Sequence, residues 1–312
     1  MTPAFLLLTL SLIDGTRTEA VELKTATGTL HGTLDLPAGD GRWPVVLLHP
    51  GAGPTDRDGN NPRMKNDSLK MVGRGLARSG LACLRIDKRG IAASAKAFGK
   101  EEDLRLSTYG DDVTAWVRWL REDRRFGKVG FIGHSEGSLV GTAAAADARF
   151  DAFVSLCGPG RKFGDVLREQ LQKVPKELNE KCVAIIAELE AGREVKDVPK
   201  ELAALFRPSV QPYLISTFKP DPAKELAALT CPVLVVSGST DLQVKEADYK
   251  LLTGSRKGVK GVRIEHMDHV LKESLAAVQL VQIASYTDPT LPLHPQLLPT
   301  LTGFLNAELA AK

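Results

Sequence analysis

The sequence predicts an α/β protein with a mostly parallel central sheet, helices on both faces of the sheet, and a helical segment inserted between two strands. Three observations support this fold class. Short apolar runs rich in β-branched residues alternate along the chain with helical patterns, which is typical of βαβ units. This alternation stops after Gly158 and resumes at Pro232, and the patterns between them are helical only. A serine flanked by glycines, Ser135, stands where one of the strands should turn into a helix.

The predicted core comprises residues 21–158 and 230–312. Its first two strands, 20–25 and 28–36, alternate in polarity as a hairpin does. The later strands are continuous apolar runs, which indicates burial on both faces of a parallel sheet. They are expected at 44–48, 81–86, 128–132, 152–156, 232–236 and 261–265, and helices are expected at 67–79, 108–120, 138–146, 245–252 and 304–311.

Residues 159–229 form the predicted insertion. Apolar residues recur there at helical spacing, and five prolines divide the segment into short helices. A helical insertion between two sheet strands is best interpreted as a lid over the carboxyl edge of the sheet. The alternative is an appendage that serves packing alone.

Composition bounds the class of protein. The chain has 312 residues, of which 43% are apolar and 25% charged, as in globular proteins with a substantial core. The net charge is only +3 and no basic cluster with interleaved aromatic residues occurs, so nucleic acid is not an expected partner. The cysteines lack the spacing of metal ligands, and free, mostly buried thiols are expected. They are Cys83, Cys157, Cys182 and Cys231. We expect neither a metal nor another cofactor.

The first 20 residues contain an apolar stretch, residues 4–13, that resembles the hydrophobic part of a signal peptide and is too short to span a bilayer. No Lys or Arg precedes it, and no clear cleavage site follows it. We expect an exported protein, periplasmic or secreted. The alternative is a cytoplasmic protein whose N-terminal segment packs on the fold. No integral membrane span is predicted, and the sequence does not predict an oligomeric state.

The stretch Gly133-His134-Ser135-Glu136-Gly137 matches the pattern G-x-S-x-G of a nucleophile elbow. An apolar strand precedes it and a run of small, helix-compatible residues follows it. Such a sharp turn strains the serine backbone and needs small neighbours on both sides. Ser135 is therefore the predicted nucleophile, with an ordinary glycine-rich turn as the alternative.

A serine hydroxyl needs a base to take its proton and a carboxylate to orient that base. In this topology the acid and then the histidine follow the serine. His269, in the loop after the last strand, is the predicted base, and His266 is the second choice. Asp241, after the strand that follows the insertion, is the predicted acid, with a turn or helix-capping aspartate as the alternative.

Attack on a carbonyl creates an oxyanion that needs pre-placed hydrogen-bond donors. The backbone N–H of Glu136 is the first predicted donor, and the Glu136 side chain is then free to hold nearby loops. The second is the N–H of Ala52, in the long loop after the first parallel strand, with Gly51 as the alternative.

Three basic residues, Arg57, Lys88 and Arg89, are expected near this site. They either attract an acidic substrate or tie loops together through neighbouring aspartates, and the second interpretation is favoured.

Four further motifs carry a resemblance. They are the loop 51–60 (GAGPTDRDGN), residues 87–90 (DKRG), the elbow, and residues 206–213 (FRPSVQPY) of the insertion. With these motifs the chain resembles the α/β-hydrolase superfamily from about residue 29 to its end. Within that superfamily it resembles the bacterial serine esterases related to EstD, a branch near the dienelactone hydrolases. Ala52 stands where such relatives usually have serine, which leaves the backbone donor in place.

The resemblance implies a carboxylesterase that acts on short acyl chains of small-molecule esters without a metal, with a triad of Ser135, Asp241 and His269. The expected reaction is ester hydrolysis through an acyl-enzyme. The same triad would equally serve a thioesterase, an acyltransferase or an amidase/peptidase. A non-catalytic protein that binds a ligand in the same fold is a further alternative.

Overall fold

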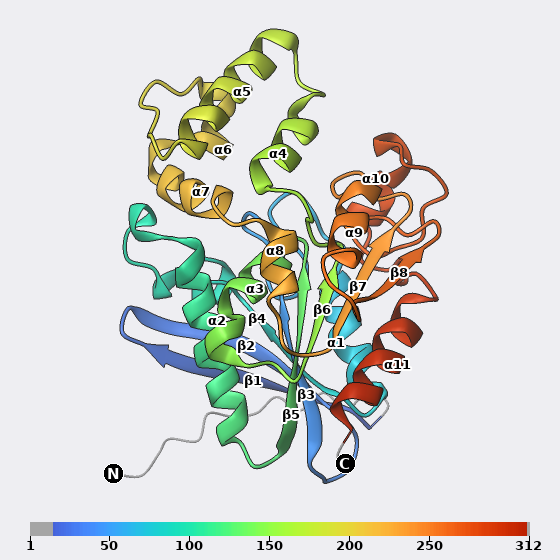
Figure 1. Cartoon of the computed structure of the whole chain (residues 1–312). Helices are drawn as coiled ribbons and strands as arrows, with labels where there is room; N and C mark the ends of the chain where they lie inside the picture. Colours follow the sequence, from blue (N-terminus) through green and yellow to red (C-terminus); the bar gives the residue numbers. More distant parts are fainter. Residues whose placement is uncertain (1–14, 311–312) are drawn as a thin grey trace.

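A computed structural model describes residues 15–310 and contains one eight-stranded sheet in the order β1-β2-β4-β3-β5-β6-β7-β8 (Figure 1). β1 and β2 pair antiparallel, β2 and β4 also pair antiparallel, and all later pairs are parallel. The predicted fold class is thus confirmed. The apolar segment 4–13 lies outside the described residues. The strands are β1 (Arg17–Thr25), β2 (Gly28–Leu36), β3 (Trp43–His49), β4 (Ala82–Ile86), β5 (Phe126–His134), β6 (Ala152–Leu156), β7 (Val233–Gly238) and β8 (Lys260–Ile264).

Helices cover both faces of the sheet because its central strands are apolar on both sides. β4 and β6 are buried along their whole length. On one face, α1 and α11 contribute Leu69, Val72 and Leu301 to a core shared with alternate residues of β3 and β5. On the other face, α2 and α3 contribute Trp116 and Val140 to a second core. The α-helices outside the segment between β6 and β7 are α1 (Ser68–Arg78), α2 (Leu106–Glu122), α3 (Glu136–Ala148), α9 (Glu246–Thr253), α10 (Gln279–Thr287) and α11 (Leu297–Leu309).

Two element boundaries differ by three residues or more from the sequence predictions, and one helix is additional. β1 begins at Arg17 rather than at residue 20, because its first residues pair in register with the end of β2 and the Thr18 hydroxyl donates to Asp35 at 3.1 Å. α11 begins at Leu297 rather than at residue 304. α10 was not predicted at all.

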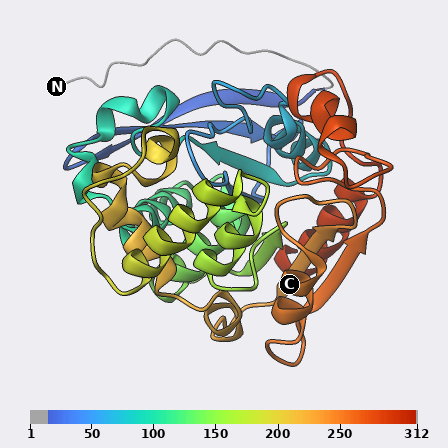
Figure 2. The same cartoon turned by 90° about the horizontal axis from the view of Figure 1, so that it is seen from above.

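The segment between β6 and β7 is helical, as the sequence predicted. It contains α4 (Phe163–Leu171), α5 (Lys176–Glu190), α6 (Ala203–Phe206), α7 (Gln211–Phe218) and α8 (Pro222–Ala227). α4 to α7 lie beyond the carboxyl ends of the central strands, and the view from above places them over the middle of the sheet (Figures 1 and 2). The Glu101 carboxylate ties the segment to the core by accepting hydrogen bonds from Arg207 and Ser209. Its role as a lid stays a prediction.

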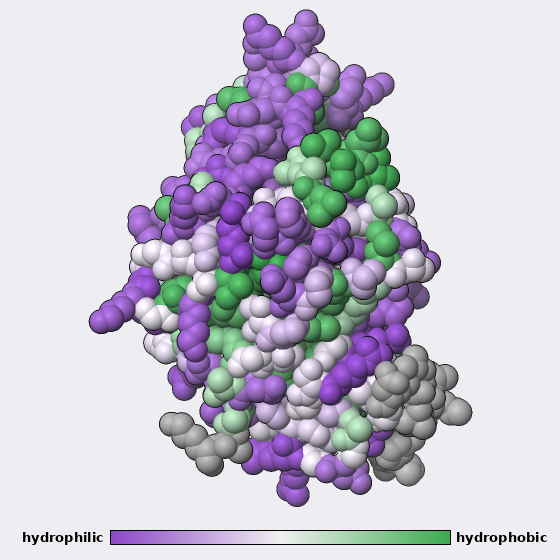
Figure 3. Space-filling model, turned by 90° about the vertical axis from the view of Figure 1, so that its right-hand side faces the viewer, coloured by the Kyte–Doolittle hydropathy of each residue, from purple (hydrophilic) through white to green (hydrophobic). Residues whose placement is uncertain are grey.

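One surface carries an apolar patch beside α10 (Figure 3). Five large apolar side chains are exposed there: Leu275, Val278, Leu280, Val281 and Ile283. Across residues 15–310, none of the helices combines the length and the apolar character that a membrane crossing requires.

Candidate active site

Ser135 occupies a strained turn between β5 and α3. Its backbone angles are φ 54° and ψ −126°, outside the regions that non-glycine residues prefer, which costs about 1 to 3 kcal/mol. The turn is held by the Ser135 N–H, which donates to the Leu156 carbonyl on β6 at 2.9 Å. A Cβ atom on Gly133 would lie 2.4 Å from the backbone of Gly137, so the turn requires glycine at that position. The predicted strand, turn and helix are all present, and β5 and α3 each extend two residues beyond the predicted bounds at both ends.

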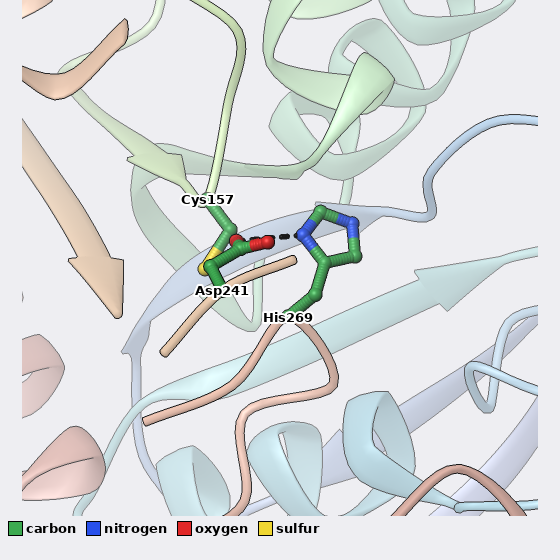
Figure 4. Close-up of side chains that lie close together, drawn as sticks. All are labelled: Cys157, Asp241 and His269. Carbon is green, nitrogen blue, oxygen red and sulfur yellow. Dashed lines mark hydrogen bonds and ion pairs between the residues drawn. The ribbon is translucent and has the colours of Figure 1, made fainter. Parts of the chain in front are cut away.

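Asp241 and His269, predicted as acid and base, lie together at the carboxyl edge of the sheet (Figure 4). Nδ1 of His269 is 2.8 Å from Oδ2 of Asp241, and both side chains are buried. The other carboxylate oxygen, Oδ1, accepts the N–H groups of Gln243 at 2.7 Å and Val244 at 3.0 Å. A carboxylate oxygen can only accept a hydrogen bond, so the contact with Asp241 assigns the shared proton to Nδ1 of His269. Nε2 lies on the side of the ring that faces away from Asp241 (Figure 4). With the proton on Nδ1, Nε2 carries the lone pair that a general base needs.

His134 holds the His269 loop against the elbow. The rings of His134 and His269 are 5.0 Å apart, and Nε2 of His134 donates to the backbone carbonyl of His269 at 2.9 Å. Burial, together with the nearby His269, lowers the pKa of His134 to about 3, so His134 is a neutral donor at physiological pH. The candidate base is therefore fixed beside the residue that precedes Ser135.

The competing residues of the sequence prediction have other partners. The side chain of His266 is 45% exposed and faces Glu265 at 4.0 Å, so the structure brings His269 and not His266 to Asp241. Asp268 accepts hydrogen bonds from Ser285 and from the backbone N–H of Lys272, and burial raises its pKa. These contacts stabilise the loop that carries His269 rather than orient the imidazole ring.

The predicted oxyanion loop, which follows β3, approaches the elbow closely. A Cβ atom on Gly51 would lie 3.0 Å from Cβ of Ser135, so any side chain at position 51 would press on the nucleophile. The next N–H, that of Ala52, donates no hydrogen bond within residues 15–310. The N–H of Glu136 is the first of α3 and belongs to the N-terminal groups that have no acceptor within a helix. Glu136 follows Ser135 directly and Ala52 follows Gly51, which packs against Ser135. Their role as oxyanion donors stays a prediction, with Gly51 as the alternative to Ala52.

The three basic residues near the site bind protein groups, in agreement with the favoured interpretation. Arg57 donates to Asp87 at 2.6 Å, and Arg89 donates to Asp112 at 3.0 Å. Lys88 differs from both, because its ammonium group donates to the backbone carbonyls of Gly51 and Gly53 instead of a carboxylate.

Sequence reasoning missed the surroundings of the Glu136 side chain. This side chain is 3% exposed and lies among buried groups that include Lys88 and Tyr213. Burial raises the pKa of Glu136, and the Lys88 ammonium and the Tyr213 hydroxyl oppose that shift. The polar identity of Glu136 beside an apolar helix was the only signal available in the sequence.

Cys157, Asp241 and His269 are the residues that could hold a metal ion here, since their ligand atoms lie within 4.8 Å of one another (Figure 4). Zinc would require a thiolate. Burial raises the pKa of the Cys157 thiol well above its usual value, and Asp241 and Asp268 raise it further. The donor set therefore fits a proton shared between Asp241 and His269 better than a metal. All four cysteines have free thiols, and only Cys231 is partly exposed.

A surface cavity of about 370 Å³ lies between α10, the end of α4 and the Asp241 loop. Met64, Leu242, Gln243 and Tyr286 are among its lining residues, whereas Ser135 and His269 are not. The cavity therefore borders the loop that follows Asp241, and none of Ser135, Asp241 and His269 lines it.

Comparisons with known proteins agree with this geometry. Residues 44–181, which include Ser135, match a family model described as the alpha/beta hydrolase fold. Est1E from Butyrivibrio proteoclasticus superimposes with a TM-score of 0.62 at 18% identity, covering 94% of this chain and 99% of that one. The esterase Pf2001 from Pyrococcus furiosus gives a TM-score of 0.56 at 16% identity, with 94% and 93% coverage. The protein therefore has the α/β-hydrolase fold.

Within this fold the chain is similar in sequence to Esterase EstD of Thermotoga maritima. The two are 27% identical over 253 residues, which make up 78% of this chain and 58% of that protein. The chain thus spans somewhat more than half the length of this relative. The resemblance to bacterial esterases that the sequence motifs indicate is confirmed.

Proposed function

We propose that the protein is a carboxylesterase-type serine hydrolase that cleaves carboxylic esters through an acyl-enzyme. The observation that carries this proposal is the Asp241–His269 pair at 2.8 Å, held beside a strained serine elbow by His134. The similarity to proteins named as esterases supports the same reaction class. Short acyl chains are the proposed preference, on the strength of the resemblance to that branch.

The first half of the proposed reaction forms the acyl-enzyme. Nε2 of His269 takes the proton of the Ser135 hydroxyl while Oγ attacks the carbonyl carbon of the ester, and the carbonyl electron pair moves onto oxygen. The N–H groups of Ala52 and Glu136 stabilise this oxyanion, each worth about 3 kcal/mol in such sites. Collapse of the intermediate breaks the bond to the alcohol, which leaves with the proton from His269.

The second half repeats these steps with water as the nucleophile. His269 takes a proton from water, the hydroxide attacks the acyl carbon, and collapse returns the proton to Ser135 and releases the acid. Asp241 stays ionised throughout and stabilises the imidazolium form of His269. The helical insertion, residues 159–229, serves in this proposal as a lid that excludes water from the acyl pocket.

Replacement of Ser135 with Ala tests the proposal. The variant should lose at least about a thousandfold in turnover of short p-nitrophenyl esters and should not be labelled by a fluorophosphonate probe. Unchanged turnover would show that Ser135 is not the nucleophile. A matched Ser138→Ala variant, which removes a buried hydroxyl of the same helix that bonds Ser155 at 2.8 Å, should keep its activity and its labelling.

The substrate class is tested on the wild-type protein. p-Nitrophenyl esters of increasing chain length, an acyl-CoA and an amide of the same acyl group are compared by kcat/KM. A preference for the thioester or the amide would favour the thioesterase or amidase alternatives. Ligand binding without any labelling of Ser135 would favour a non-catalytic binding protein.

A further inference from the structure

Lys88 lies in a position where it can control the oxyanion loop. It follows β4, is 3% exposed, and donates from Nζ to the carbonyl of Gly51 and to that of Gly53, the latter at 2.8 Å. These two carbonyls belong to the residues on either side of Ala52. One ammonium group therefore holds the chain on both sides of the candidate oxyanion donor.

The geometry of the peptide bond links Lys88 directly to the Ala52 N–H. The Gly51 carbonyl and the Ala52 N–H belong to the same planar trans peptide, so they point in opposite directions. A cation that binds the oxygen from one side turns the N–H to the other side and polarises the peptide, which strengthens the donor. Gly51 is packed against Ser135, so the position of this peptide is set relative to the nucleophile.

Glu136 is the charged group that favours a charged Lys88. Both residues are almost fully buried; burial lowers the pKa of Lys88, and the Glu136 carboxylate opposes this shift. The ring of Tyr109 lies 5.8 Å from Nζ and offers a further favourable contact for a cation. Tyr213, on α7 of the insertion, packs edge-on against Tyr109, with the ring centroids 5.5 Å apart.

We propose that Lys88, balanced by Glu136, is a positioning residue that aims and polarises the Ala52 N–H toward the oxyanion. This inference rests on the proposed serine hydrolase function. Lys88 touches neither the substrate nor the reacting atoms, and it acts through the peptide between Gly51 and Ala52. Its loss should therefore weaken stabilisation of the transition state and leave binding of the substrate nearly unchanged.

The test compares Lys88→Met with the matched control Arg89→Met. Arg89 is a buried cation of the same loop, but it donates to Asp112 and to the Ala97 carbonyl and not to the oxyanion loop. Lys88→Met should lower kcat on p-nitrophenyl acetate by at least about 30-fold and change KM less than about threefold, since loss of one oxyanion donor costs about 100-fold to 1000-fold. Arg89→Met should keep kcat within about fivefold at a temperature where both variants are folded.

A second readout reports on the oxyanion itself. Replacing the carbonyl oxygen of the substrate with sulfur weakens its hydrogen bonds, so the ratio of kcat/KM for the ester over that for the thionoester measures the contribution of the oxyanion donors. This ratio should fall at least about fivefold in Lys88→Met and stay unchanged in Arg89→Met. If Lys88→Met does not fold, Glu136→Gln removes the balancing charge and should lower the same ratio.

Two results overturn the inference. A folded Lys88→Met variant with wild-type kcat, or with a wild-type ratio, shows that Lys88 does not position the donor. If the wild-type protein itself is not labelled at Ser135 by a fluorophosphonate, the proposed function fails and the inference fails with it. Labelling of the wild type together with a normal Lys88→Met variant refutes the positioning role alone.

Discussion

Replacement of Asp241 with Asn gives the sharpest test of the candidate triad, because the structure fixes what the amide must do. Oδ1 of Asp241 accepts two backbone N–H groups, from Gln243 and Val244, so an asparagine must keep its oxygen there. Its NH₂ group then faces Nδ1 of His269, where Oδ2 of Asp241 accepts at 2.8 Å. Two donors cannot share this contact. Nδ1 must give up its proton, and Nε2 then carries the proton instead of the lone pair that Ser135 requires.

The expected loss follows from this change of tautomer. The same substitution in the catalytic triad of a serine protease lowers kcat by about 10,000-fold. At 1.36 kcal/mol for each factor of ten, that is about 5.4 kcal/mol of transition-state stabilisation. The assay is kcat/KM on p-nitrophenyl acetate, with circular dichroism to confirm folding. Asp268→Asn is the matched control, since Asp268 is buried one residue from His269 but bonds Ser285 and the Lys272 N–H.

The control Asp268→Asn should lose less than about tenfold in kcat/KM, because the contacts of Asp268 stabilise the loop and do not set the tautomer of His269. A folded Asp241→Asn variant with more than a tenth of wild-type activity would refute the assignment of Asp241. Equal losses in the two variants would also refute it, since the effect would then come from the loop as a whole.

Three further predictions concern the scaffold. Gly133→Ala should lower the free energy of unfolding by about 3 kcal/mol through its clash with the elbow, whereas Gly127→Ala, whose Cβ would lie 3.7 Å from its nearest neighbour, should change it by less than about 1 kcal/mol in urea titrations. His49 is buried and its pKa is lowered to about 3, first by burial and then by a nearby lysine. The neutral, buried His49 contributes its full stability to the fold above pH 6.5, and this contribution is lost as the pH falls toward 3. Between about pH 5.5 and 4.5, the free energy of unfolding of His49→Gln should therefore fall by about 1.4 kcal/mol less per pH unit than that of the wild type. Equal slopes in urea titrations at the two pH values would contradict this. Glu101→Ala should increase proteolytic cleavage within residues 159–229 by about tenfold relative to the exposed neighbour Glu102→Ala, because Glu101 anchors the insertion to the core.

Most of the sheet could be predicted because its strands are buried on both faces. Such strands are continuous apolar runs, and a run such as residues 152–156 identifies itself without knowledge of its neighbours. The strand ends then determine which side chains can meet, since the carboxyl ends of parallel strands share one edge. Asp241 and His269 were predicted from this rule, and the structure places them in contact.

α10 could not be predicted because its pattern is inverted. It buries the polar side chains of Gln282 and Ser285 and exposes Leu280, Val281 and Ile283. Hydrophobic periodicity identifies a helix by its apolar buried face, and this helix has a polar one. Gln282 instead donates to the carbonyl of Thr240, in the loop before Asp241, and to that of Ala276, in the segment before α10, so hydrogen bonds place this helix.

The start of α11 was missed for a different reason. Pro299 suggests a break, but it is the third residue of this helix, where the missing N–H would have no intrahelical acceptor. The buried residues Leu297, Leu301 and Leu305 continue one face across it. Pro299 therefore lies in the first turn of α11 and does not interrupt the helix.

The surroundings of Ser135 show why a carboxylate can follow the candidate nucleophile. A negative charge in the first turn of α3 favours the helix, but it opposes an oxyanion that develops at the same helix end. The buried Lys88 nearby reduces this conflict, because its positive charge opposes the negative charge of Glu136. The ammonium group in turn binds the Gly51 carbonyl, so the positive end of that peptide is directed away from Lys88. Arg89, the next residue, has Asp112 as its own partner, which leaves Lys88 free for this task. Under the proposed positioning role, the two adjacent basic residues after β4 would therefore differ in function: Arg89 belongs to the scaffold, and Lys88 acts on the electrostatics of the candidate site.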